Sequence, residues 1–162
     1  MRTALSKLAI ALCVSAMPAP AFAACNTLSL CSCTASASGI ALGSYDPFSP
    51  TPVTSSGTVT VECTLSIALA GSYDIALSTG SSGSFAPRTM MNGGSALNYN
   101  LYTSPALTQV WGDGAGGSTK VTKSFTALLF FSQTTNIYAE IPAGQNVAAG
   151  SYADTITVTV TY

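Results

Sequence analysis

The sequence has 162 residues and a mass of 16.3 kDa, and only 7% of it is charged, against about 25% in an ordinary soluble domain. It contains five cationic residues and no histidine. The length suits a single domain, and the scarcity of cations excludes nucleic acid as a partner. The missing histidine excludes Ser-His-Asp and Cys-His catalytic triads and histidine-dependent zinc sites.

The first 23 residues predict a secretory signal peptide. Arg2 and Lys7 precede a short apolar stretch, and small residues at Ala21 and Ala23 mark a cleavage site after Ala23. The apolar stretch is shorter than the roughly 20 residues of a membrane-spanning helix. We therefore expect export and no integral membrane span.

The expected mature domain, residues 24–162, keeps three cations, six anions and four of the five cysteines, because Cys13 leaves with the leader. An oxidising compartment favours disulfides between these cysteines. A second interpretation stays open, since Phe22-Ala-Ala-Cys25 resembles a lipobox that would place a lipid on Cys25. We favour a disulfide role for Cys25, because leucine is usual where this sequence has Phe22.

The mature chain predicts β-strands throughout. Apolar and polar residues alternate with period two in segments bounded by Gly, Ser, Pro and Asn, and no stretch shows a helical period. The clearest segments are Thr58–Leu65, Tyr73–Ser78, Leu97–Tyr102, Phe125–Phe131 and Thr155–Tyr162. Long loops are expected over Ser44–Gly57 and Thr79–Gly94. The pattern predicts an all-β sandwich or barrel.

The strand pattern also suggests how the cysteines pair. Cys33 precedes an expected strand over Thr34–Leu42, and Cys63 lies near the end of the strand that follows. A hairpin centred near residue 48 would place Cys33 opposite Cys63, within the Cα separation of about 4.4–6.8 Å that a disulfide needs. Cys25 would then pair with Cys31, although four cysteines allow two other connectivities.

Motifs for catalysis are weak in this sequence. Gly112–Gly117 matches G-x-G-x-x-G, but the residues after it resemble a strand or loop instead of the helix that a dinucleotide site requires. The six carboxylates show no spacing that selects an acid–base pair. We therefore predict no catalytic, cofactor-binding or metal-binding residues, and no enzyme.

The aromatic residues leave an alternative function open. Tyr99, Tyr102, Trp111 and Tyr138 would suit a sugar-binding platform on a self-contained, secreted β-sandwich that binds carbohydrate. In an all-β chain such residues more often belong to the core or to cross-strand pairs.

The mature chain resembles the spore coat protein U domain over nearly its whole length. The opening run Cys33–Pro47 and the later Trp111-Gly-Asp-Gly114 are among the segments that carry this resemblance. Further matching segments are Gly57–Cys63, Tyr73–Gly80, Arg88–Met90, Leu97–Tyr102, Ile141–Asn146, Ala149–Thr155 and Val158–Tyr162.

The resemblance implies a structural subunit of a pilus or coat fibre on a Gram-negative bacterium, assembled by the archaic chaperone–usher pathway. It implies an immunoglobulin-like β-sandwich that lacks its last strand. A periplasmic chaperone, and later a neighbouring fibre subunit, would donate the missing strand, with an outer-membrane usher directing export to the cell surface. The sequence ends within its most regular strand, and Ile156, Val158, Val160 and Tyr162 are expected to form one wall of the acceptor groove.

The N-terminal segment departs from the pattern of a self-polymerising subunit. Between Ala23 and Cys31, only Leu28 and Leu30 are candidate donor side chains. A Cys25–Cys31 bridge would hold its ends within about 7 Å, whereas the extended segment would span about 20 Å. Either these cysteines pair otherwise, or the protein accepts a strand without donating a standard one, as a minor or terminal subunit would.

Overall fold

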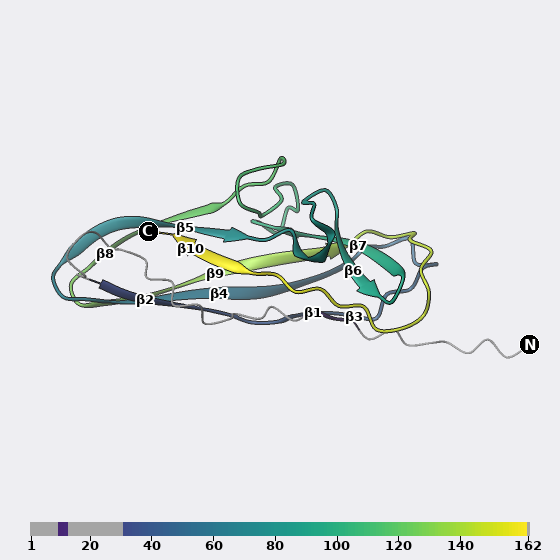
Figure 1. The fold of residues 1–162 in the computed structure, drawn as a ribbon, viewed down its shortest axis with the longest axis horizontal. Helices are drawn as coiled ribbons and strands as arrows, with labels where there is room; N and C mark the ends of the chain where they lie inside the picture. The colour runs from purple at the N-terminus through teal and green to yellow at the C-terminus, as the bar shows by residue number, and fades with distance from the viewer. Residues whose placement is uncertain (1–9, 13–30, 162) are drawn as a thin grey trace, which may run out of the picture.

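The computed structural model describes residues 10–12 and 31–161, and within them the chain forms two packed β-sheets without an α-helix (Figure 1). One sheet has five strands in the order β2-β4-β9-β7-β6, and the other has three in the order β10-β5-β8. A two-stranded ribbon, β1-β3, completes the arrangement. The elements are β1 (Ile10–Leu12), β2 (Cys31–Ala37), β3 (Ile40–Gly43), β4 (Val53–Leu65), β5 (Leu69–Leu77), the 3-10 turn η1 (Gly80–Ser82), β6 (Arg88–Asn92), β7 (Ser95–Tyr102), β8 (Val121–Ala127), β9 (Phe130–Ile141) and β10 (Val158–Thr161).

The long strands β4 and β9 form the centre of the larger sheet. Their antiparallel register runs from Val53↔Ile141 at one end to Thr64↔Phe130 at the other. The predicted alternation on β4 is confirmed, because Val59 and Val61 are buried while Glu62 and Thr64 are exposed. Alternate side chains therefore face the second sheet and build the core between the two layers.

The predicted hairpin register is confirmed, but the predicted strand over residues 34–42 is wrong as a single element. Cys33 does lie opposite Cys63. The chain leaves the sheet at Ser38, and β3 starts at Ile40 as a separate strand. A Cβ atom on Gly57 would lie 2.7 Å from Cγ1 of Ile40. Because glycine has no side chain, Ile40 can pack into the core at this point.

The predicted strand over Phe125–Phe131 is also wrong as a single element. The chain turns at Leu128 and Leu129, which separates β8 from β9. The backbone N–H of Leu65 donates to the carbonyl oxygen of Leu129, so the turn is held against the end of β4. The sequence has neither Gly nor Pro at this turn, so the period-two pattern continues through it without a break.

Both predicted loops are shorter than expected. Strand β4 already starts at Val53, inside the predicted loop over residues 44–57. The predicted loop over residues 79–94 contains η1 and strand β6. Strand β6 pairs with β7 on one side, and on its other side Met91 forms an isolated antiparallel bridge with Ala153.

Candidate functional site: an open strand edge

The last strand, β10, lies at the edge of the smaller sheet (yellow in Figure 1). Val158 lies opposite Leu77 and Val160 lies opposite Ile75, so both valines share the core-facing side of the sheet. Leu77 and Ile75 are fully buried, whereas Val158 and Val160 are only partly buried. Within the described residues β10 pairs with β5 alone, which leaves its other backbone edge open.

The four residues expected to line one wall of an acceptor groove have different positions. Val158 and Val160 lie on the open edge strand. Ile156 precedes β10 and is completely buried in the core. Tyr162 lies outside the described residues. The regular strand is therefore shorter than the predicted segment Thr155–Tyr162.

A second edge is found at β3. Strand β3 pairs antiparallel with β1, and the register joins Ile40 to Leu12 and Gly43 to Ile10. Strand β1 lies inside the segment that the sequence predicts to be a signal peptide. On β3, Ile40 and Leu42 are buried and the residues between and after them are exposed. In this structure β1 occupies the β3 edge.

The polar residues that hold the chain before β10 were missed by the sequence reasoning. The Tyr99 hydroxyl donates to Oδ2 of Asp154 at 2.6 Å, and Oδ1 of Asp154 accepts the backbone N–H groups of Ser81 and Thr155 at 2.8 Å. Both Tyr99 and Asp154 are buried. Burial, reinforced by the Asp154 carboxylate, raises the pKa of Tyr99. The hydrogen bonds fix the segment from which β10 starts.

Arg88 forms a neighbouring buried group that the sequence did not reveal either. Its guanidinium donates to the carbonyl oxygens of Ser78 and Trp111 and to Oδ1 of Asn100, at 2.7–3.0 Å. The ring of Phe85 lies 4.9 Å from the guanidinium carbon. Burial lowers the pKa of Arg88 to about 10, so the group is still charged at neutral pH. The sequence offered one signal for this group, because Arg88 is the one arginine of the expected mature domain.

The cysteine prediction is confirmed for one pair. Cys33 and Cys63 form a disulfide with a Cα–Cα distance of 4.1 Å, which joins β2 to β4. Cys31 is also disulfide-bonded. The predicted partner Cys25 and the candidate donor residues Leu28 and Leu30 lie outside the described residues, so these assignments remain predictions.

The aromatic residues do not form the sugar-binding platform of the alternative interpretation. Tyr99 and Trp111 are completely buried. The indole N–H of Trp111 donates to the carbonyl oxygen of Ile75 at 2.9 Å, so this side chain is a core residue. Tyr102 and Tyr138 are partly exposed and face each other across β7 and β9 as a cross-strand pair. A platform that needs Trp111 on the surface is therefore wrong.

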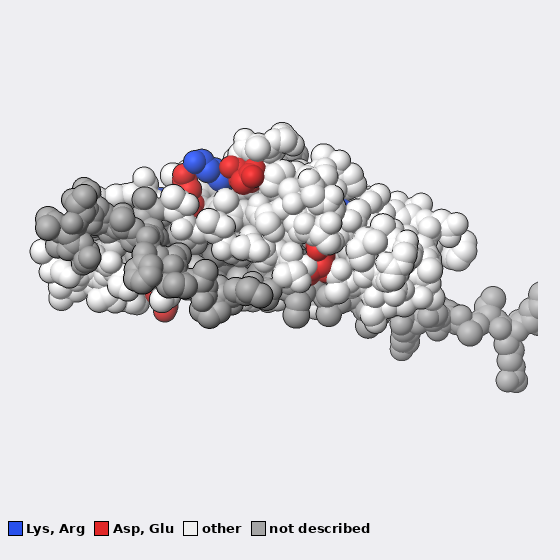
Figure 2. Space-filling model, in the orientation of Figure 1, with Lys and Arg blue, Asp and Glu red and all other residues white. Residues whose placement is uncertain are grey.

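The glycine-rich motif does not have the surroundings of a dinucleotide site. Gly112–Gly117 lies in a turn that leads to strand β8, not to the helix that a dinucleotide site requires. Over residues 10–12 and 31–161, no three His, Cys, Asp or Glu side chains gather as a metal site would require. No helix in that part of the chain is long and apolar enough to span a membrane. Figure 2 shows few charged side chains on this face, and most of them gather at its upper edge.

Residues 21–159 match the family model for the Spore Coat Protein U domain. The chain belongs to this family. A search among curated proteins found no match. The resemblance on which the sequence interpretation rested is thereby confirmed.

Among solved structures, this spore coat protein U domain is similar to a chain of the CsuC–CsuE chaperone–tip adhesion subunit pre-assembly complex from the archaic chaperone-usher Csu pili of Acinetobacter baumannii. The TM-score is 0.52 at 20% sequence identity. The match covers 82% of this chain and 40% of that chain, so the domain spans less than half the length of this relative. At this identity the similarity concerns the fold, and it confirms the predicted immunoglobulin-like β-sandwich.

Proposed function

We propose that this protein is a structural subunit of a surface fibre, and that another chain completes its sandwich by donating a strand to the β10 edge. The carrying observation is the contrast across one strand pair: Leu77 and Ile75 are fully buried, while Val158 and Val160 opposite them are only partly buried. A strand added along β10 would bond to the free backbone groups and cover both valines. Family membership and the similarity to a chaperone-bound pilus subunit support the same assignment.

The β3 edge supports the second half of the proposal. Removal of residues 1–23 would take β1 away from β3 and leave that edge unpaired as well. An open subunit with two such edges would be prone to aggregate. We therefore expect a periplasmic chaperone to cover the subunit first, before an outer-membrane usher passes it to a neighbouring subunit at the cell surface.

Burial energies explain why the open subunit should depend on a partner. Complete burial of one valine or leucine side chain contributes about 1.5–3 kcal/mol. A donor strand with several apolar residues would therefore contribute an amount comparable to the whole stability of a small domain, about 5–15 kcal/mol. A subunit that lacks this contribution would be only marginally folded.

Its place along the fibre depends on the disulfide that Cys31 forms. If Cys31 is bridged to Cys25, residues 24–30 cannot extend as a donor, and the protein would be a minor or terminal subunit that accepts a strand without donating a standard one. Because Cys33 and Cys63 are paired and Cys13 would leave with the leader, Cys25 is the one cysteine of the expected mature domain left for Cys31. Leu28 and Leu30 are free to donate only if that bridge does not form. Peptide mapping under non-reducing conditions distinguishes these cases, because a linked Cys25–Cys31 peptide excludes an extended donor.

Expression of the mature domain in the periplasm, with and without the chaperone, tests the proposal. We expect the domain alone to be degraded or aggregated, and the co-expressed domain to purify as a complex with the chaperone. Assembled material should run as a ladder of heat-resistant oligomers. A soluble monomer that unfolds cooperatively without any partner would contradict the proposal.

A further inference from the structure

One end of the sandwich carries a group of exposed apolar side chains, which we call the apolar end. It comprises Ile67 in the β4–β5 turn, Leu128 and Leu129 in the β8–β9 turn, and Phe130 at the start of β9, with exposed fractions from 49% to 74%. The two turns are adjacent, because Leu65 hydrogen-bonds to Leu129. Residues 65–70 and 126–131 include no charged residue. Clustered apolar exposure of this kind marks an interaction surface.

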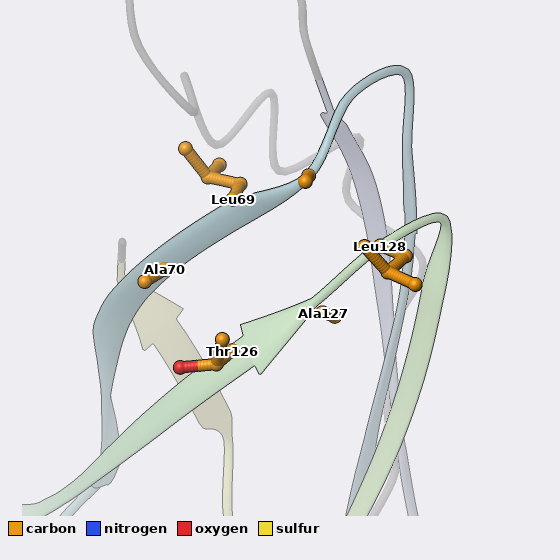
Figure 3. Close-up of a pocket in the computed structure, with 6 residues that line it drawn as sticks. Leu69, Ala70, Thr126, Ala127 and Leu128 are labelled. Atoms are coloured by element: carbon orange, nitrogen blue, oxygen red, sulfur yellow. The ribbon is translucent and has the colours of Figure 1, made fainter.

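The apolar end carries a shallow hollow of about 300 Å³, largely open to solvent, over the paired ends of β5 and β8. Figure 3 shows Leu69 and Ala70 on one side of this hollow and Thr126 and Ala127 on the other, with Leu128 at its margin. Its lining is apolar apart from the threonine hydroxyl and the backbone. The hollow thus suits one apolar or aromatic side chain.

The opposite end carries a single aromatic side chain that projects into solvent. Phe48 is 94% exposed, in the loop between β3 and β4. The turn around it is held locally, because the N–H of Phe48 donates to Oδ1 of Asp46 and the N–H of Ser49 donates to the Asp46 carbonyl oxygen. Tyr45 anchors the same loop, since it is buried and its hydroxyl accepts the N–H of Gln145. Phe48 is thus presented on an ordered support.

The two features cannot meet within one molecule. The Phe48 loop adjoins Val53, the first residue of β4, and the apolar end adjoins Leu65, the last. The 13 residues of β4 separate them by about 40 Å at the rise of a β-strand. Figure 1 shows the β3–β4 side and the β8–β9 turn at opposite ends of the elongated domain.

We propose that Phe48 of one copy inserts into the hollow at the apolar end of a second copy. The inference rests on the proposed fibre function, and it adds a contact between folded domains to the donated strand. Because the two complementary surfaces lie at opposite ends, the contact is heterologous and repeats head to tail without closing, as a linear fibre requires. A buried anchor in an apolar pocket concentrates binding energy in few residues, and holding it in place before binding lowers the entropic cost.

A strand donated by the mature N-terminal residues would place a second copy at the same end. Cys31 starts β2 opposite Leu65, so the mature N-terminal residues join the domain beside the apolar end. If those residues donated a strand, they would bring the accepting subunit to this end. The contact itself uses only the described surfaces. Its repetition along a fibre requires copies of this chain to be neighbours, which is the case in which residues 24–30 donate a strand.

Site-specific photo-crosslinking in assembled fibres tests the contact. Phe48 is replaced by the photoreactive amino acid p-benzoyl-phenylalanine in the full chain, and isotope-labelled and unlabelled copies are mixed to identify links between molecules. We expect links to residues 67–70 and 126–130 of another copy, at about tenfold the yield of the same probe at exposed Asn136, in line with an anchor worth more than 1 kcal/mol. Links only to residues 24–30, to the chaperone or to another protein would overturn the proposal.

A charge exchange provides an independent test. Phe48→Asp and Leu128→Lys should each reduce fibre yield by about tenfold, the scale of one lost anchor. The double variant should recover it, because opposite charges then meet between copies. A double variant that assembles no better than the single variants would overturn the pairing. None of these changes touches β10, so chaperone binding should persist; a loss of chaperone dependence in the unmodified protein would instead contradict the proposed function.

Discussion

Tyr99 and Asp154 are separated by 55 positions in the sequence and joined by a buried hydrogen bond of 2.6 Å. The bond connects β7 in the larger sheet to the segment that leads into β10. The same carboxylate accepts the N–H groups of Ser81 and Thr155 through its other oxygen. One side chain thus joins three parts of the chain at the point where the open edge strand begins.

Tyr99→Phe should therefore destabilise the folded subunit by about 1–3 kcal/mol, because Oδ2 of Asp154 would remain buried without its donor. The measurement is denaturant-induced unfolding of assembled fibres, followed by the fluorescence of Trp111, the single tryptophan, which is buried. Thr60→Val is the control, since its hydroxyl forms only an exposed hydrogen bond with Thr134. Equal effects of the two changes would show that the Asp154 contact does not stabilise the fold.

The raised pKa of Tyr99 predicts a loss of stability in alkali. The folded pKa lies above the ordinary value of 10.0, so the unfolded chain loses this proton first as the pH rises. The contribution of Tyr99 to the free energy of unfolding is complete below pH 10. Above pH 10 it declines by up to about 1.4 kcal/mol per pH unit. Arg88, whose pKa is lowered to about 10, acts in the opposite direction in the same range.

A comparison of variants separates these two groups. Arg88 is present in both the unmodified protein and Tyr99→Phe, so the difference between their stability profiles from about pH 9 to about pH 12 reports Tyr99. We expect the unmodified protein to lose its advantage over the variant as the pH rises above 10, the ordinary pKa of a tyrosine. Parallel profiles across this range would contradict the assignment.

Val160→Asp should abolish capture by the chaperone. Val160 shares the core-facing side of β10 with Val158, and strand addition would bury the new carboxylate without a partner, at a cost of several kcal/mol. Thr159→Asp is a matched control on the same strand, because Thr159 is exposed on the opposite face. Co-purification with tagged chaperone measures both. Retention of Val160→Asp at the level of Thr159→Asp would exclude β10 as the acceptor strand.

Removal of the Cys33–Cys63 disulfide by a double change to serine should destabilise the subunit by about 3.5 kcal/mol, the chain-entropy value for a loop of this length. Fibre yield in the periplasm should fall accordingly, and the unfolding midpoint of the remaining fibres should shift to lower denaturant. When the variant and the unmodified fibres are both measured under reducing conditions, which also break the disulfide of Cys31, their unfolding midpoints should coincide. A variant as stable as the oxidised protein would show that the bridge contributes little.

Local patterns predicted much of the sheet architecture. Apolar and polar residues alternate with period two on β4, β5 and β7. A hairpin register depends only on which residues lie opposite one another. The strand pattern was therefore sufficient to predict the Cys33–Cys63 pair. The breaks at Ser38 and Leu128 were not predictable in this way, because each depends on a distant neighbour: Ile40 enters space left by Gly57, and Leu129 bonds to Leu65.

For the candidate site, the amino-acid pattern was enough to establish which residues alternate along the last strand and which family the chain resembles. It could not distinguish Ile156, which is enclosed, from Val158 and Val160, which remain partly open, because burial depends on which strands lie alongside. The Arg88 and Asp154 networks and the separation of Phe48 from the apolar end likewise emerge only in the folded chain. Local chemistry sets the period of a strand, whereas exposure and pairing follow from contacts between segments far apart in the chain.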